Sequence, residues 1–236
     1  MSADGFSSSL WAATAIAAPE CATLQGPHES ETVVIGGGFC GLSAALHLAE
    51  AGRTVTVLEA REPGWGASGR NGGQVNPGWK LNPSEILQRY GPEHGPRVLA
   101  LVDGACDLVF DLIAKHGIDC SPVRSGYIQG SFKPRETALL ETKVREWQAQ
   151  GAPAEMLDRA GMADMLGSER YIAGMLDRRG GNLQPLSYAR GLAHAAIAAG
   201  ATIFSRSAAS AVSRVGNDWL IEAAGGQVRA RHLLLG

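Results

Sequence analysis

The hydrophobic pattern of residues 32–59 changes period twice, which predicts a strand, a helix and a second strand. Residues 32–35 are a short β-branched run, as in strands that are buried on both faces. Residues 53–58 form a second such run, and Gly52 before them is placed to end a helix. The buried face predicted for that helix has spacing i, i+3, i+4, i+7 and consists of Leu42, Ala45, Leu46 and Ala49.

The rest of the chain alternates between helical and strand-like periods. A two-glycine turn at Gly225 and Gly226 predicts a hairpin, and Gly117 and Gly200 are placed to end helices. The further predicted helices are 83–90, 92–116, 134–150, 158–166 and 183–200. The further predicted strands are 120–123, 126–132, 171–176, 201–205, 219–223, 228–231 and a buried strand beginning at 232–235.

Three glycines between the first strand and the first helix form the pattern G-x-G-x-x-G. Gly36 allows a tight turn out of the strand, Gly38 lets a diphosphate approach the backbone, and Gly41 lets the helix pack close to the sheet. The helix start offers N–H groups and the positive end of its dipole to an anion. A glycine-rich turn without a ligand is the alternative, but the strand before it and the helix through it favour a nucleotide site.

A carboxylate ends the second predicted strand. Glu59 follows the glycine turn by roughly the 20 residues expected of an acid that binds ribose hydroxyls in dinucleotide-binding units. A carboxylate at this place disfavours a 2′-phosphate, and therefore NADP.

Composition and charge exclude several classes of protein. The net charge of −2, from 21 basic and 23 acidic residues, indicates neither a nucleic-acid partner nor a membrane-surface partner. Cys21, Cys40, Cys106 and Cys120 lack metal-ligand spacing, and we expect reduced thiols, a cytoplasmic protein and no metal site. Cys40, inside the glycine turn, is either a small buried residue or a redox thiol beside a cofactor.

The amino-terminal 30 residues lack a clear period, and we expect an irregular arm or a short helix on the surface there. Residues 10–19 resemble the apolar core of a signal peptide, but Asp4 precedes them and no Lys or Arg does, which favours mature chain. No apolar run is long enough to span a bilayer.

A glycine-rich stretch, 61–78, follows the βαβ unit, and loops of this length are usually functional. Its segment GWGASGRNGGQ, behind VVIGGGFCGLSAALHLA and VLEA, resembles the FAD-dependent oxidoreductases of the D-amino acid oxidase (DAO) superfamily. Within that family, the chain is most similar to the gamma-glutamylputrescine oxidase and glycine/sarcosine oxidase-like branch, over about residues 10–236.

The resemblance implies a set of FAD-binding residues. Those near the phosphates and ribitol include Ser68, Gly69 and Arg70, in a glycine-rich loop whose N–H groups can form an anion-binding nest. Some relatives have a flavin-linking histidine at the position of Arg70, so the resemblance implies non-covalent FAD. Asn71 to Gln74 would lie near the isoalloxazine, and the backbone of Ala209 would bind adenine. The full set is Gly36, Gly38, Phe39, Cys40, Gly41, Glu59, Ala60, Arg61, Ala67, Ser68, Gly69, Arg70, Asn71, Gly72, Gly73, Gln74 and Ala209.

The fold expected is α/β: a Rossmann-like FAD-binding domain (GR2-type) with an inserted α+β substrate domain, truncated at the C-terminus. The expected ranges are an arm at 1–30, the FAD-binding domain at 31–80 and 183–236, and a partial substrate domain at 81–182. Relatives continue beyond the last strand, so we expect a site formed at its ADP end and open at its flavin-ring end, and an isolated chain that does not turn over amines.

The function expected is oxidation of an amine or amino acid by hydride transfer to flavin N5, followed by imine hydrolysis and flavin reoxidation. An NAD-dependent dehydrogenase and a non-catalytic nucleotide-binding remnant are the alternatives. No catalytic side chain is assigned: His94 and His116 stand alone in helices, and Arg124 and Tyr127 either face a substrate or pack structurally. The sequence does not indicate an oligomeric state.

Overall fold

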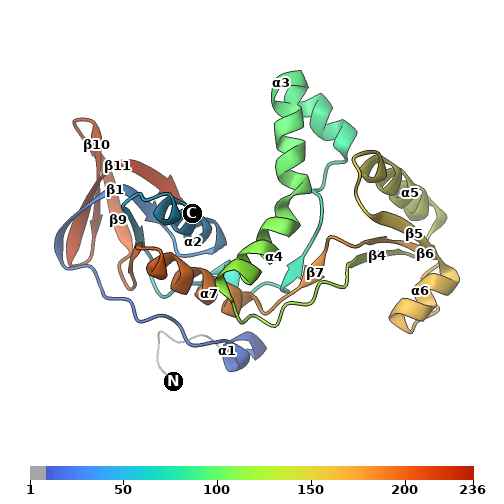
Figure 1. Ribbon diagram of the computed structural model, residues 1–236, viewed down its shortest axis with the longest axis horizontal. Coiled ribbons are helices and arrows are strands. Elements are labelled where there is room, and N and C mark those ends of the chain that lie inside the picture. The colour runs from blue at the N-terminus through green and yellow to red at the C-terminus, as the bar shows by residue number, and fades with distance from the viewer. Residues whose placement is uncertain (1–8) are drawn as a thin grey trace. The chain divides into compact units, whose positions relative to one another are not determined.

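The computed structural model describes residues 9–236, which divide into two compact units (Figure 1). The first unit contains the residues up to Gly73, Ile113–Ser121 and Gln184–Gly236, and the second contains Gln74–Leu112 and Pro122–Leu183. Residues 113–121, inside the segment predicted to be inserted, thus group with the first unit. None of the helices in the described part of the chain has the length and apolarity required to cross a membrane.

The first unit is built on a six-stranded sheet in the order β8-β2-β1-β11-β10-β9. Four neighbouring strands are parallel, and β10 and β9 add an antiparallel hairpin edge. The β-branched residues predicted for the first strand are the most buried part of β1, with Val33 and Val34 fully enclosed. The strands are β1 Gly26–Ile35, β2 Val55–Leu58, β8 Thr202–Phe204, β9 Ala209–Val215, β10 Asp218–Ala223 and β11 Gly226–Leu235.

Two helices of this unit, α2 (Phe39–Glu50) and α7 (Pro185–Ala198), pack against each other beside the sheet (Figure 1). All four residues of the predicted α2 face are buried, and Gly52 follows the helix with a φ of 75°. These predictions are confirmed because helical spacing and a terminating glycine are local properties of the sequence.

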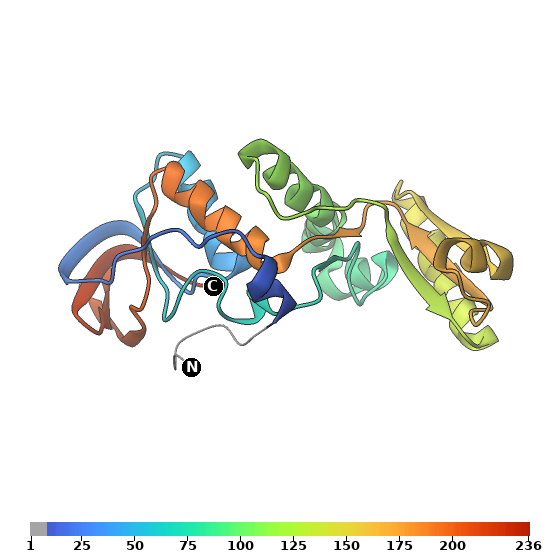
Figure 2. The ribbon, with the colours of Figure 1, turned by 90° about the horizontal axis from the view of Figure 1, so that it is seen from below.

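The amino-terminal segment lies along α7, as Figure 2 shows in blue beside the orange helix. It contains the short helix α1 (Leu10–Thr14). Four polar side chains of α7 and its N-cap bond to the segment's backbone: Gln184 to Trp11 O, Ser187 to Ile16 N, Arg190 to Ile16 O and His194 to Ala17 O. The spacing of these four side chains places them in one stripe, so a polar stripe on an otherwise apolar helix fixes a segment that has little regular structure of its own.

The second unit contains a three-stranded antiparallel sheet in the order β4-β6-β5. Two helices, α5 and α6, pack on its strands, and a two-stranded ladder joins β3 to β7. The elements are β3 Gln74–Val75, α3 Pro83–Asp103, α4 Ala105–His116, β4 Tyr127–Ser131, α5 Pro134–Ala149, β5 Ala154–Asp158, α6 Arg159–Leu166, β6 Ala173–Asp177 and β7 Gly181–Asn182, with residues 113–116 of α4 in the first unit.

Several sequence predictions were wrong. Residues 120–123 form no strand: Ser121 has a φ of 47°, and only Val123 makes an isolated bridge. Residues 26–30, expected in the arm, begin β1. Residues 228–231 and 232–235 form one strand, β11, and its end is not buried, since Leu235 is 74% exposed. The helix expected over 92–116 is divided at Gly104. The predicted separation of 83–90 from the helix that follows is confirmed, because α3 has a kink at Gly91, where φ is 71°.

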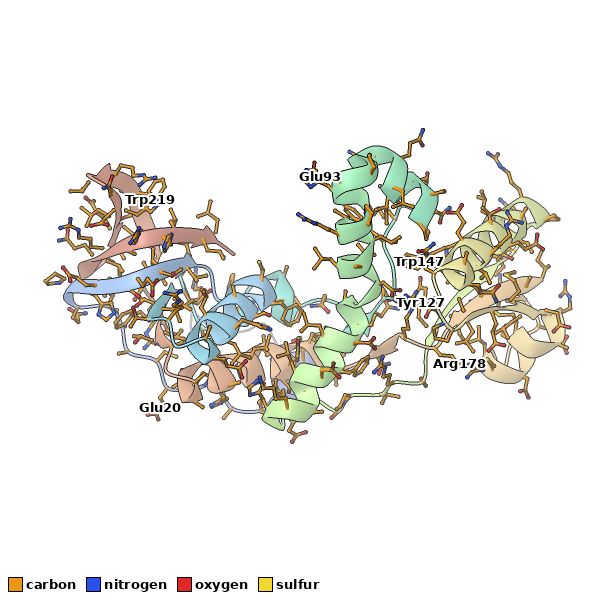
Figure 3. All side chains as sticks on the ribbon, turned by 45° about the horizontal axis from the view of Figure 1, so that its top comes forward. Glu20, Glu93, Tyr127, Trp147, Arg178 and Trp219 are labelled. Atoms are coloured by element: carbon orange, nitrogen blue, oxygen red, sulfur yellow. The ribbon has the colours of Figure 1, made fainter. Side chains whose placement is uncertain are left out.

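A buried ion cluster in the second unit was not predicted. The guanidinium of Arg179, with 8% of its side chain exposed, forms a bidentate pair with Asp177, which is 1% exposed. Arg179 also pairs with Asp103 and lies over the ring of Trp147 of α5, labelled in Figure 3, with 4.8 Å between Cζ and the ring centroid. Paired and stacked in this way, a buried charge is tolerated in the interior.

We expect Arg179→Met to destabilise the second unit by about 3–5 kcal/mol, because it leaves the carboxylate of Asp177 buried without its partner. Arg178→Met is the matched control, since its salt bridge to Glu155 is solvent-exposed, with 61% of the Arg178 side chain accessible. Urea unfolding monitored by tryptophan fluorescence measures both variants. Equal unfolding free energies for the two would contradict the importance of the buried cluster.

Candidate functional site

The glycine turn at the end of β1 depends on residues without side chains. Gly36 has a φ of 109°, which disfavours any other residue. A Cβ added to Gly41 would collide with the carbonyl oxygen of Gly36, so the start of α2 lies directly against the turn. A Cβ added to Gly37 would lie 2.9 Å from Glu59 Oε2. The turn therefore needs glycine at these positions because neighbouring protein atoms leave no room for side chains.

Glu59 follows β2 and binds the same turn. Its Oε2 accepts a hydrogen bond from Gly37 N at 2.6 Å, and its Oε1 accepts one from Arg61 N at 2.8 Å. The loop after β8 supports its backbone, because Glu59 N donates to Phe204 O and Ser207 N donates to Glu59 O. Each carboxylate oxygen retains acceptor capacity after these bonds, so the group can also accept from hydroxyls of a ligand.

The second glycine-rich loop reaches the start of α2. Phe39 N, in the first turn of the helix, donates to Ser68 Oγ at 3.0 Å. Gly64 N donates to Gly37 O at 2.8 Å, and Gly64 and Gly69 pack so closely on α7 that a Cβ would contact Ala189 or Leu186. The two motifs, about 30 residues apart in the sequence, thus meet at one helix N-terminus.

The same loop carries two cations and an indole. The guanidinium carbons of Arg61 and Arg70 lie 4.9 Å and 4.6 Å from the ring centroid of Trp65. Arg70 Nε donates to Trp65 O at 2.7 Å. Farther along, Asn71 donates to Ser68 O and accepts from Gly73 N, which closes a compact turn.

The structure gathers most of the predicted residues around Gly36–Gly41 and Glu59, but not all. Gln74 starts β3 in the second unit, and Ala209 is the half-buried first residue of β9, packed against the core of the first unit. Gly37, Gly64 and Trp65 were missed by the sequence reasoning. Gly37 could have been found, because it lies inside the run of three glycines, whereas Trp65 carries no spacing signal. The exposed members of the predicted set are Cys40, Ala60, Ala67, Arg70, Asn71, Gly72 and Gln74.

The isolated titratable residues do not converge on the glycine turn. His94 is exposed on α3, and His116 Nε2 lies 3.3 Å from Glu50 at the opposite end of α2. Arg124 pairs with Asp107 and lies over Phe110, and Tyr127 is half-buried in β4. The contacts of these residues are the ion pairs and packing expected of residues with a structural role.

Burial keeps several other groups near the helices neutral. The ring of Tyr188 on α7 lies 5.3 Å from that of Phe39, and burial raises the pKa of Tyr188 to about 12. Burial also raises the pKa of the Cys106 and Cys120 thiols to about 11. None of these three groups is poised to exchange protons near neutral pH. Within residues 9–236, no group of three or more His, Cys, Asp or Glu side chains could hold a metal ion.

The arrangement fits a dinucleotide cofactor. It combines a side-chain-free turn, a helix N-terminus with a hydroxyl at its first turn, and a carboxylate after the neighbouring strand. These groups match a diphosphate and a ribose, and they lie beyond the carboxyl ends of β1 and β2, where open α/β sheets bind ligands.

Comparisons of the sequence agree with this geometry. The family model described as FAD dependent oxidoreductase (DAO) matches residues 31–235. The gamma-glutamylputrescine oxidoreductase of Escherichia coli strain K12 is 33% identical over 229 residues, 97% of this chain and 53% of that protein. A probable oxidoreductase, OrdL, of Haemophilus influenzae is 34% identical over 180 residues, 75% of this chain and 42% of that protein. The chain thus spans about half the length of these curated relatives.

Solved structures share the fold. Glycine oxidase from Geobacillus kaustophilus superposes with a TM-score of 0.73 at 22% identity, covering 89% of this chain and 55% of that one. L-Amino acid deaminase from Proteus myxofaciens gives a TM-score of 0.77 at 21% identity, with coverage of 94% and 48%.

We expect Gly41→Ala to lower the unfolding free energy by more than about 3 kcal/mol, because the new methyl group would overlap the Gly36 carbonyl and force α2 away from the sheet. Gly66→Ala is the control, since nothing lies within 4 Å of a Cβ at that position. Thermal and urea denaturation of both variants measure the difference. If Gly41→Ala were as stable as Gly66→Ala, the close approach would not constrain the turn.

Proposed function

Because the chain belongs to the DAO family of FAD-dependent oxidoreductases, we propose that its glycine turn and second loop together bind the ADP half of FAD in an enzyme that oxidises an amine or amino acid. The observation that carries this proposal is the hydrogen bond from Phe39 N to Ser68 Oγ. It joins the second loop to the helix start, beside the carboxylate of Glu59. A dinucleotide-binding fingerprint alone does not account for such a loop.

Each group has a role in this proposal. Gly36 makes the tight turn, Gly41 allows the close packing of α2, and Gly38 lets the diphosphate approach the backbone. The N–H groups at the start of α2 stabilise the charge of the diphosphate. Glu59 binds the ribose hydroxyls while Gly37 N and Arg61 N hold it in place. Ser68 and Arg70 face the phosphates and ribitol, the stretch from Asn71 to Gln74 faces the flavin ring, and the backbone of Ala209 binds adenine.

Binding is non-covalent, since the chain has Arg70 where some relatives have a flavin-linking histidine. When FAD is bound, its isoalloxazine ring supplies the two-electron oxidation of the carbon that bears nitrogen. The substrate class is supported by the relatives, whose names specify gamma-glutamylputrescine, glycine and L-amino acids. The protein's contribution is to orient the cofactor and to fix the charges around its phosphates.

The proposal is tested by adding FAD to the purified protein and recording flavin fluorescence and visible absorbance. We expect saturable quenching by one FAD for each chain. Anaerobic addition of amines and amino acids, including a gamma-glutamylated diamine and glycine, then tests for bleaching of the flavin band. A protein that binds NAD but not FAD would contradict the cofactor assignment. Because the flavin-ring end of the site is expected to be open in residues 1–236, the substrate class is contradicted only if a protein as long as the curated relatives binds FAD and none of these compounds bleaches it.

We expect Glu59→Gln to weaken FAD binding about tenfold or more. The amide has one acceptor oxygen, so either Gly37 N or Arg61 N would face an NH₂ group, and the charged bonds to ribose, worth about 1.5–3 kcal/mol each, would be lost. Equilibrium dialysis measures the affinity. Glu31→Gln is the control, because Glu31 pairs with Arg53 at the surface. Unchanged affinity in Glu59→Gln would show that this carboxylate does not bind the cofactor.

A further inference from the structure

The indole of Trp65 is stacked against two arginine side chains. Both Arg61 and Arg70 place their guanidinium carbon within 5 Å of its ring centroid, at 4.9 and 4.6 Å. Both distances are within the range of a cation–π interaction, which is strongest for tryptophan among the aromatic residues. One ring thus holds two cations, and Arg70 is fixed additionally by its bond to Trp65 O.

The face of the indole, and not its N–H group, makes these contacts. Trp65 Nε1 is enclosed and has no hydrogen-bond partner among residues 9–236. A buried indole N–H usually finds a partner, and leaving one unpaired costs free energy. Other contacts of the ring must therefore offset this cost. The two arginine stacks are contacts of that kind.

The position of Trp65 connects two parts of the glycine-rich site. Arg61 follows the carboxylate of Glu59 by two residues, and its own N–H donates to that carboxylate. Arg70 directly follows the short helix Ala67–Gly69, which contains Ser68. Trp65 itself follows Gly64, whose N–H binds the carbonyl of Gly37 in the glycine turn. The ring therefore holds one cation from the ribose side of the site and one from the Ser68 side.

We propose that Trp65 is a positioning residue that preorganises Arg61 and Arg70 for the diphosphate of the cofactor. The proposal rests on the proposed FAD site. An arginine side chain loses rotamer entropy when it is fixed, and a stack that fixes it before the ligand arrives removes part of this cost from binding. Two cations also match the two negative charges of a diphosphate, whereas a nucleoside without phosphate has no anionic group for the two guanidinium groups to bind.

The test compares FAD, ADP and adenosine binding by isothermal titration calorimetry in the purified protein and in two variants. Trp65→Leu keeps an apolar side chain without a π face, and we expect it to bind FAD and ADP about tenfold more weakly while adenosine binding stays unchanged. Trp65→Phe keeps a ring and should retain ADP affinity within about threefold. A loss of adenosine binding equal to that of ADP, or unchanged ADP affinity in Trp65→Leu, would overturn the proposal.

A double-mutant cycle of Trp65→Leu with Arg70→Gln tests whether Trp65 acts by positioning Arg70 or through a general effect on the fold. The cycle does not depend on the stability of one variant alone. If Trp65 acts through Arg70, Trp65→Leu should weaken ADP binding much less in the Arg70→Gln background than in the original protein. The salt dependence of ADP binding should also become shallower in both single variants. Additive losses would overturn the proposal. The unmodified protein is titrated first. If it binds neither FAD nor ADP, the proposed function itself is overturned.

Discussion

The approach of α2 to the end of β1 is the constraint on which the candidate site depends. No side chain fits between Gly41 and the carbonyl of Gly36, so the first turn of the helix is fixed against the strand to within the size of a methyl group. That contact determines where the N–H of Phe39 points, and so where Ser68 must lie to accept its hydrogen bond. It also places Gly37 N opposite Glu59. The backbone therefore sets the geometry of the site, and side chains from two other segments, Ser68 and Glu59, bind to it.

Charges are stabilised differently in the two units. In the first unit the carboxylate of Glu59 is held by the backbone N–H groups of Gly37 and Arg61, and its remaining lone pairs can accept from a polar ligand. In the second unit Asp177 is neutralised by Arg179, which is itself paired with Asp103 and covered by Trp147. The first arrangement suits recognition, and the second fixes the fold of a small sheet at a cost in desolvation.

The sequence predicted those features that are local, and missed those that depend on distant partners. The βαβ unit and the termination of α2 at Gly52 follow from hydrophobic period and glycine placement over a few residues. The bond between Ser68 and Phe39, the stacking on Trp65 and the pairing of Arg179 with Asp103 join residues whose proximity only the tertiary fold creates. Residues 120–123 illustrate the opposite error, because a strand was predicted for four residues whose backbone turns at Ser121 with a positive φ.

The register of β1 has a consequence for how the chain acquires its structure. Gly26 pairs with Gly226 and Ile35 with Leu235, so one side of this central strand is completed by residues that follow it by 200 positions in the sequence (226 − 26 and 235 − 35). During synthesis on the ribosome, Val33 and Val34 have an unpaired edge until residues 226–235 have been translated. Such late, non-local pairing slows folding and leaves a nascent strand open to wrong partners. Chaperone demand and yield on expression should thus depend on how quickly β11 emerges and docks.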